Sequence, residues 1–199
     1  ASRTLPGSAR QVHVNDPGRT HWEGFATATA AARAGGVAII VDMPLNSIPP
    51  TTTVAALEAK RHAARSAVLS ADVGFWGGIV PGNLAERAGL AAAGVLGFKC
   101  FLVASGVDEF GCIGFDDLDS ALDATAAVGL PLLVHAESPA VIAAAPAPGA
   151  GYSSYLASRP PEAEVEAIAA VIAAARRTGG RAHILHLSAA DALPLIAAA

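Results

Sequence analysis

An apolar run of strand length encloses a single lysine: Val95-Leu96-Gly97-Phe98-Lys99-Cys100-Phe101-Leu102-Val103. Such a run predicts a strand that is buried on both faces. A charged amine in that interior costs several kcal/mol, or its pKa falls by up to about 3 to 5 units. A neutral lysine is a nucleophile, which can form a Schiff base or capture carbon dioxide as a carbamate. Lys99 is therefore the first candidate functional residue; a lysine that reaches from the strand end to water is the alternative.

Two further runs of strand length end in residues of metal-binding type. Leu130 to Glu137 contains His135 near its end, and Arg181 to Ser188 contains His186. Strands that alternate with helices indicate a parallel sheet, and polar residues at the carboxyl ends of such strands usually line an active site. The sequence therefore predicts a metal site at these strand ends.

The composition bounds the class of protein. The 199 residues are 53% hydrophobic and 15% charged, with a net charge of -4 and two cysteines. These values are typical of a soluble globular protein from a reducing compartment, and we expect a cytoplasmic one. The segment Ala1 to Val12 lacks the apolar core of a signal peptide, and no apolar run approaches the roughly 18 residues of a membrane span. Without a basic cluster, neither nucleic acid nor membrane is an expected partner.

Strand-like and helix-like segments alternate along the whole chain. The expected strands are Gln11–Val14, Val37–Met43, Ala71–Gly77, Val95–Leu102, Pro131–Ala136 and Ala182–Leu187. The expected helices are Glu23–Ala34, Val54–Ser66, Leu84–Ala93, Phe115–Val128, Pro161–Thr178 and Ala189 to the end. This pattern predicts an α/β fold with about six βα units, which is an incomplete (β/α)8 TIM barrel. An open, doubly wound sheet is the rival architecture.

The expected organisation is an irregular N-terminal segment, residues 1–10, and a partial barrel domain, residues 11–199. The chain stops at Ala199, inside what reads as the sixth helix. Because closed barrels contain eight βα units, we expect a fragment that holds about two-thirds of one.

The chain resembles the allantoinases, within the cyclic-amidohydrolase group that also holds dihydroorotases and hydantoinases. The residues that carry the resemblance form an ordered series of motifs, which covers almost all of residues 11–199: His13–Thr20, Trp22–Phe25, Asp42–Thr51, Gly74–Gly78, Gly97–Leu102, Ser105–Phe110, His135–Glu137, Tyr155–Pro161 and His186–Ser188. Any one of these motifs is weak evidence, whereas so many in the same order are strong evidence.

The resemblance implies a partial barrel of the metal-dependent amidohydrolase type. It also implies two divalent metal ions, bridged by carboxylated Lys99 and by a hydroxide that attacks a cyclic amide. His135 and His186 would bind one ion and His13 the other, with Lys99 as the catalytic bridge. Zinc suits these ligands, although manganese, cobalt or iron would fit as well.

Each histidine also has a structural interpretation, because a histidine at the end of an apolar strand is often a satisfied core residue. His183 and His186 differ by three positions, so in a strand they point to opposite faces. The family pattern selects His186 and leaves His183 facing the helices.

The resemblance places Asn15, Asn46 and Ser105 at the substrate. Asparagine amides can hydrogen-bond a ureide or a ring carbonyl. Related dihydroorotases carry arginine at the position of Asn15, so asparagine argues against dihydroorotate. Turn formation is the alternative role for all three residues.

The chain departs from the family pattern at its opening metal motif, Asp-x-His-x-His. Ala9 and Gln11 stand where the acid and the first histidine belong, and an amide oxygen is a poorer zinc ligand than imidazole. The final aspartate ligand of the family, which is also its proton shuttle, has no counterpart among the 199 residues. General acid–base help is worth roughly 10² to 10⁴ in rate, so we expect this chain alone to be nearly inactive.

Two classes of function remain open. The first is metal-dependent hydrolysis of a cyclic ureide, with allantoin to allantoate ahead of hydantoinase-like, dihydropyrimidinase-like and dihydroorotase-like reactions. The second is a non-catalytic amidohydrolase-like assembly partner, which Ala9 and Gln11 favour. For the enzyme we expect a small-molecule substrate and a homo-oligomer, either a dimer or a tetramer.

Overall fold

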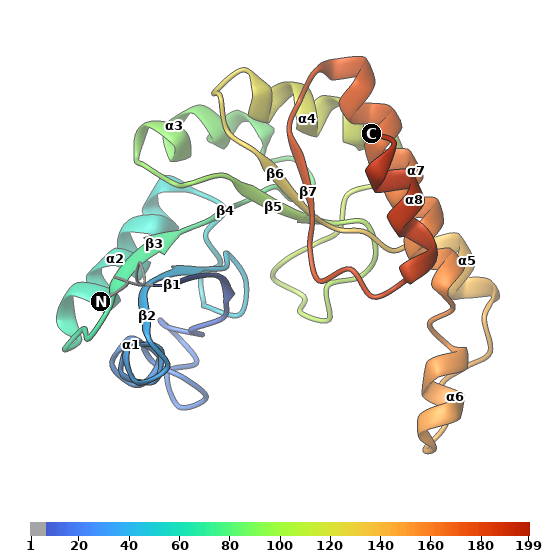
Figure 1. The fold of residues 1–199 in the computed structure, drawn as a ribbon. Helices are drawn as coiled ribbons and strands as arrows, with labels where there is room; N and C mark the ends of the chain where they lie inside the picture. The colour runs from blue at the N-terminus through green and yellow to red at the C-terminus, as the bar shows by residue number, and fades with distance from the viewer. Residues whose placement is uncertain (1–6) are drawn as a thin grey trace, which may run out of the picture. The chain divides into compact units, whose positions relative to one another are not determined.

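The computed structural model describes residues 7–199. The chain forms two compact units. The first unit contains the described residues up to Lys99 together with Val107–Phe110, and the second contains Cys100–Gly106 and Gly111–Ala199. Figure 1 shows the order of helices and strands along the chain. The prediction of one domain over residues 11–199 stays a prediction.

Parallel strands form the sheets of the first unit. The order β1-β2-β3 joins β1 (Gly7–Val12), β2 (Val37–Asp42) and β3 (Asp72–Phe75), with Ile40 opposite Val73. The short strand β4 (Gly77–Gly78) pairs in parallel with Phe98 and Lys99 of β5 (Phe98–Phe101). The carboxyl ends of parallel strands lie at one edge of a sheet, so the loops that follow them are placed to carry a site.

The helices of the first unit follow its strands. They are α1 (Phe25–Ala34), α2 (Val54–Ser66), the 3-10 turn η1 (Leu84–Glu86) and α3 (Arg87–Ala92). At the start of α2, the Thr53 hydroxyl accepts the N–H of Ala56 at 3.1 Å, which satisfies a donor that the helix itself leaves open. Leu57 and Phe25 are fully buried, so these helices turn their apolar faces inward.

The second unit continues the alternation of strands and helices. β6 (Leu132–His135) pairs in parallel with β7 (Ala182–Ile184), and Leu102 after β5 donates its N–H to the carbonyl of His135 at 3.1 Å. The helical segments are η2 (Phe115–Asp117), α4 (Leu118–Ala126), α5 (Pro139–Ala144), α6 (Tyr152–Ala157), α7 (Pro161–Thr178), η3 (Ala190–Ala192) and α8 (Leu193–Ala197).

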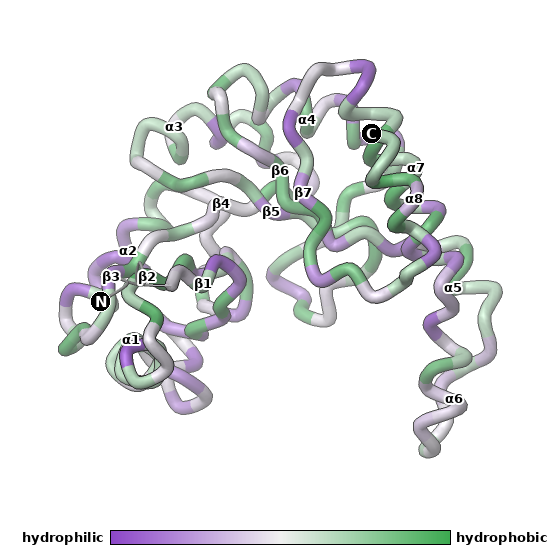
Figure 2. The backbone as a smooth tube through the Cα atoms, viewed as in Figure 1, coloured by the Kyte–Doolittle hydropathy of each residue, from purple (hydrophilic) through white to green (hydrophobic). Residues whose placement is uncertain are grey.

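Helix α7 is the longest helix of the second unit and packs against α4 and β7 (Figure 1). Its charged residues lie near its two ends and its middle is apolar, and its buried face includes Ile168 and Val171 (Figure 2 shows the hydropathy along the chain). Pro161 occupies the first turn and Gly179, with φ of 70°, ends the helix in the left-handed conformation that glycine adopts without strain. These signals predict the helix from Pro161 to Thr178, and the structure confirms both bounds.

Some expectations differ from the structure. Residues 7–10 belong to β1, although an irregular segment was expected over residues 1–10, of which 1–6 lie outside the described part; pairing with β2 orders them. β7 ends at Ile184 rather than Leu187, because the chain turns at His186, which has a φ of 32°. Helices α5 and α6 lie between β6 and α7, where no helix was expected; Ser138 caps α5 by accepting the N–H of Val141.

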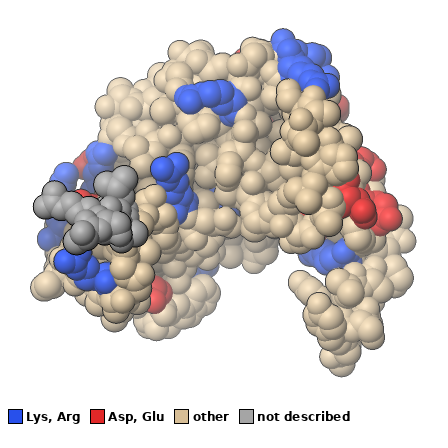
Figure 3. All heavy atoms as spheres, viewed as in Figure 1, with Lys and Arg blue, Asp and Glu red and all other residues tan. Residues whose placement is uncertain are grey.

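Charged side chains are sparse on one face of the molecule. On the face shown in Figure 3, uncharged residues cover most of the surface, and acidic and basic groups are dispersed among them. Within residues 7–199, no helix is both long and apolar enough to cross a membrane.

Candidate functional site

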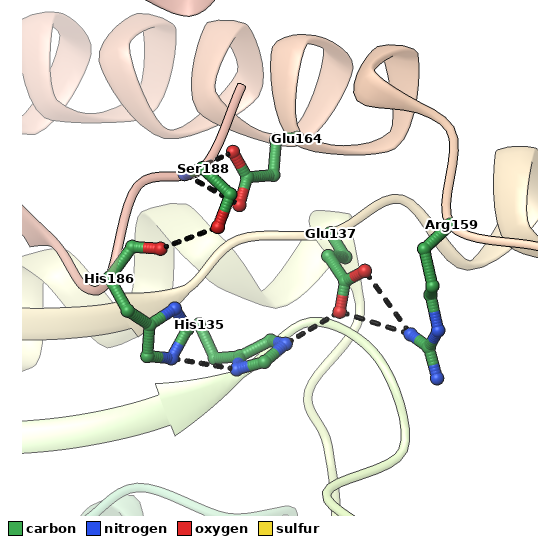
Figure 4. A network of polar contacts seen from close by, with 6 residues as sticks. All are labelled: His135, Glu137, Arg159, Glu164, His186 and Ser188. Carbon is green, nitrogen blue, oxygen red and sulfur yellow. Dashed lines mark hydrogen bonds and ion pairs between the residues drawn. The ribbon is translucent and has the colours of Figure 1, made fainter. Parts of the chain in front are cut away.

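The predicted site residues fall into two sets, one in each unit. His135 and His186 lie together in the second unit, with Nδ1 of His135 3.1 Å from Nε2 of His186 (Figure 4). Strand β6 ends at His135, and the turn after β7 carries His186. The ring of Phe101 stacks on that of His135, with a centroid distance of 4.6 Å and an interplanar angle of 19°. The aromatic contact restricts the His135 ring to one plane, so its nitrogens point in fixed directions.

The carboxylate of Glu137 contacts the other nitrogen of the His135 ring, and Arg159 in turn contacts Glu137. Nε2 of His135 lies 2.7 Å from Oε2 of Glu137, and Arg159 donates to both Glu137 oxygens at 3.1 and 3.2 Å (Figure 4). The hydrogen bond from His135 and the Arg159 charge hold the pKa of Glu137 below its usual value, against the effect of burial. An ionised carboxylate only accepts hydrogen bonds, so Nε2 carries the proton. In neutral His135 the Nδ1 lone pair is then available toward His186.

A cavity of about 630 Å³ opens beside the two histidines. Its lining includes His135, His186, Ser105, Arg159 and Tyr155, all from the second unit. Ser105, predicted to contact substrate, therefore shares a cavity with two predicted metal ligands. The cavity combines apolar walls with a few convergent polar groups, as small-molecule sites commonly do.

Strand β7 does not extend as far as His186, which corrects the expectation that both His183 and His186 lie in it. Strand alternation was expected to separate the two side chains, but β7 ends at Ile184, so His186 does not belong to the strand. Its contact with His135 nevertheless agrees with the family-based choice. His183 lines a different cavity, together with Val171 and Ile196.

The first unit holds His13, Asn15, Asn46 and Lys99. Nδ1 of His13 lies 3.4 Å from Nδ2 of Asn46. Asn15 and Asn46 adopt left-handed backbone conformations, with φ of 62° and 72°, which asparagine tolerates in turns. Oδ1 of Asn15 is buried and has no hydrogen-bond partner within residues 7–199. Turn formation and ligand contact are thus compatible roles, because the backbone makes the turn while the amide oxygen stays available.

Lys99 lies in β5 and is 1% exposed, which confirms the prediction of a buried lysine on a strand. Its carbonyl accepts the N–H of Ile79 at 2.9 Å. The alternative, a lysine whose side chain extends to water, does not agree with this burial.

Sequence reasoning missed a buried ion pair between Asp42 and Lys60. Nζ of Lys60 lies 2.7 Å from Oδ2 of Asp42 and donates to the carbonyl of Met43 at 2.8 Å. Oδ1 of Asp42 accepts the N–H of Val14, the residue after His13, at 2.8 Å. Burial raises the pKa of Asp42, while Lys60 and the two backbone N–H bonds oppose that rise. A signal was present, because Lys60 follows Leu57 and precedes Ala64 at helical spacing on the buried face of α2.

Comparison with known proteins identifies the relatives of this chain. It is 55% identical over 197 residues to an allantoinase of Streptomyces avermitilis. The aligned region covers 98% of this chain and 44% of that protein. The chain is allantoinase-like along nearly its whole length. The allantoinase of Saccharomyces cerevisiae is 46% identical over 199 residues, covering 96% of this chain and 43% of the yeast protein. No family model matches.

The allantoinase-like chain spans less than half the length of these relatives. The prediction of a fragment is confirmed, but the expected share of about two-thirds is too large, because the chain covers 44% and 43% of these relatives.

Solved structures confirm the predicted fold class, a partial (β/α)8 barrel. The allantoinase-like chain superposes on an L-hydantoinase (dihydropyrimidinase) from Arthrobacter aurescens with a TM-score of 0.89 at 32% identity, covering 96% of this chain and 43% of that one. A D-hydantoinase from Bacillus sp. AR9 gives a TM-score of 0.79 at 27% identity, covering 97% and 43%. The rival architecture, an open doubly wound sheet, is not needed to explain the alternation of strands and helices along the chain.

Proposed function

We propose that this chain supplies part of the active site of a metal-dependent cyclic amidohydrolase that opens allantoin to allantoate. The observation that carries the proposal is the convergence of His135 Nδ1 and His186 Nε2 at 3.1 Å, in a sequence that is 55% identical to an allantoinase. His135 ends one parallel strand and His186 follows another, and both border a cavity of suitable size for a small ureide.

The donor atoms of the second unit fit half of a metal site. Two nitrogens bound to a tetrahedral zinc ion lie about 3.3 Å apart, close to the separation of these two. Glu137 accepts from the far nitrogen of His135, which is the carboxylate–histidine arrangement found behind many metal ligands. Residues 7–199 contain no group of three His, Cys, Asp or Glu side chains placed to bind an ion. His135 and His186 would therefore need further ligands to hold zinc.

In this proposal His13 and carboxylated Lys99 are the further ligands. The neutral amine of Lys99 forms a bond to the carbon of carbon dioxide and releases one proton, which leaves an anionic carbamate. A bound divalent ion would supply Lewis-acid chemistry, polarising the scissile carbonyl and lowering the pKa of water. Manganese, cobalt or iron remains an alternative to zinc.

The substrate contacts are assigned to Asn15, Asn46 and Ser105. The buried and unpartnered Oδ1 of Asn15 supports this assignment, because an open acceptor suits the N–H groups of a ureide. Ser105 supports it through its place in the cavity of His135. Hydantoins and dihydropyrimidines are the second candidate substrates, favoured by the TM-score of 0.89 to an L-hydantoinase.

In this proposal the 199-residue chain by itself has low amidohydrolase activity. Ala9 and Gln11 lie in β1 directly before His13, where the family pattern has an acid and a histidine. That departure also keeps a non-catalytic assembly role as the alternative function. A homo-oligomer in the cytoplasm remains part of the proposal.

Titration with cobalt(II), a spectroscopic substitute for zinc, tests the metal assignment. We expect the visible bands of nitrogen-coordinated cobalt in the chain and their loss in His135→Ala and His186→Ala. His62→Ala is the matched control, because His62 is exposed on α2. Equal cobalt affinity in all four proteins would contradict the proposal.

A further inference from the structure

The turn that carries His186 is fastened to helix α7 by one carboxylate. Glu164 accepts the backbone N–H of Ser188 at 2.9 Å (Figure 4). It also accepts the backbone N–H of Ala189 at 2.6 Å. The hydroxyl of Ser188 in turn donates to the carbonyl of His186 at 3.1 Å. Glu164 thus binds the backbone N–H groups of the second and third residues after the histidine, and the first of these two residues is also hydrogen-bonded to the histidine itself.

The backbone of His186 needs such support. Its φ of 32° lies in the left-handed region, which is strained for a non-glycine residue and persists only where the surroundings enforce it. Hydrogen bonds from backbone N–H groups to a carboxylate are charge-assisted and are stronger than neutral ones. Two of them on adjacent residues fix the direction in which the turn leaves β7, and with it the direction of the His186 ring.

Helix α7 is a firm base for this contact. Ala163 and Ala167, one residue before and three residues after Glu164, are buried at 1% and 0% exposure. The helix also holds the segment after His135, because Ser138 donates its N–H to the carbonyl of Ala163 at 2.8 Å and its hydroxyl to Glu166 at 2.9 Å. Both histidine-bearing segments are therefore fastened to the first two turns of one helix.

We propose that Glu164 is a positioning residue, which sets the orientation of His186 toward His135 by binding the N–H groups of Ser188 and Ala189. Glu164 touches neither imidazole in this role and acts through the turn alone. The inference rests on the proposed function only where it concerns metal binding; the orientation of the ring can be measured without a metal.

Three variants of the 199-residue chain separate this role from a general effect on stability. Glu164→Ala removes the acceptor, whereas Glu164→Gln keeps one acceptor oxygen in the same place. Glu162→Ala is the matched control, because it removes an exposed acid from the same first turn of α7. Urea unfolding of each variant reports whether the fold is retained.

The readouts are amide hydrogen exchange at Ser188 and Ala189, the ¹⁵N shifts of the His186 ring, and cobalt(II) affinity. In Glu164→Ala we expect faster exchange at both amides, altered His186 shifts and a cobalt affinity that falls about 10- to 100-fold. We expect Glu164→Gln to recover most of each change and Glu162→Ala to match the parent chain.

Two results would overturn the inference: unchanged exchange in Glu164→Ala, or faster exchange with unchanged His186 shifts. A cobalt affinity that is unchanged by His135→Ala and by His186→Ala would refute the metal proposal instead. The exchange rates and ring shifts would still decide the role of Glu164.

Discussion

The ammonium of Lys60 lies 2.7 Å from the carboxylate of Asp42, and both side chains are only 1% exposed. The pair binds backbone as well, through the carbonyl of Met43 and the N–H of Val14. It therefore connects α2 to the segments that leave β1 and β2, which carry His13 and Asn46. The ion pair serves the candidate site by fixing the backbone on which these side chains stand.

Removal of one partner should be strongly destabilising. Lys60→Met leaves the Asp42 carboxylate buried without its counter-charge, which costs about 3–5 kcal/mol of unfolding free energy. Urea unfolding measures this loss, with Arg65→Met, an exposed position on the same helix, as the control. The double variant Asp42→Asn/Lys60→Met should lose less than the sum of the single variants. A loss below about 1 kcal/mol in Lys60→Met would show that the pair does not hold this region.

The ion pair between Arg19 and Glu109 should make stability depend on pH. The hydrogen bond from Arg19 holds the pKa of Glu109 below its usual value of 4.5. A carboxyl whose pKa is lower in the folded state stabilises the fold at pH values above 4.5, and this contribution disappears as the pH falls through the lowered pKa. The parent chain should therefore exceed Glu109→Gln in stability near neutral pH, by at most about 1 kcal/mol for so accessible a pair.

Unfolding at a series of pH values measures this difference. We expect it to shrink to zero in acid, and Asp108→Asn, at the exposed neighbouring position, to show no such trend. A difference between parent and Glu109→Gln that is constant across the acid range would contradict the assignment.

Gly78 in strand β4 has no room for a side chain, because Phe110 occupies the space beside it. A Cβ atom at Gly78 would lie 2.5 Å from Cε2 of Phe110 and 3.1 Å from Cγ2 of Thr52. Gly78→Ala should therefore cost about 1–3 kcal/mol through overpacking. Gly35→Ala is the control, since its Cβ would meet nothing closer than 3.5 Å at a negative φ. Equal thermal stability of the two variants would show that the ring moves aside freely.

Much of the fold could be predicted from local signals in the sequence. The helices Val54–Ser66 and Pro161–Thr178 have the predicted bounds, because caps, proline and glycine mark their ends. Strand β4 was merged into its neighbour, since two glycines carry no hydrophobic pattern. The turn at His186 was also missed, because its left-handed backbone depends on contacts made by Glu164, which precedes it by 22 residues in the sequence.

The candidate site could be predicted in part. The closeness of His135 and His186 follows from the rule that the carboxyl ends of parallel strands share one edge, helped by the family pattern. The pairing of Asp42 with Lys60 did not follow, because only the fold brings a strand end and a helix face together. Glu164 suits a helix start as an acidic residue in the first turn of α7, and its contacts with the His186 turn are visible only in the structure.

The central claim is that Lys99, His13, His135 and His186 belong to an amidohydrolase metal centre. Elemental analysis of the purified chain, beside intact mass under gentle ionisation, tests it most directly. The account predicts about one or two divalent ions per chain, together with the added mass of one carbon dioxide that is absent from Lys99→Met. A chain with neither metal nor added mass would contradict the account.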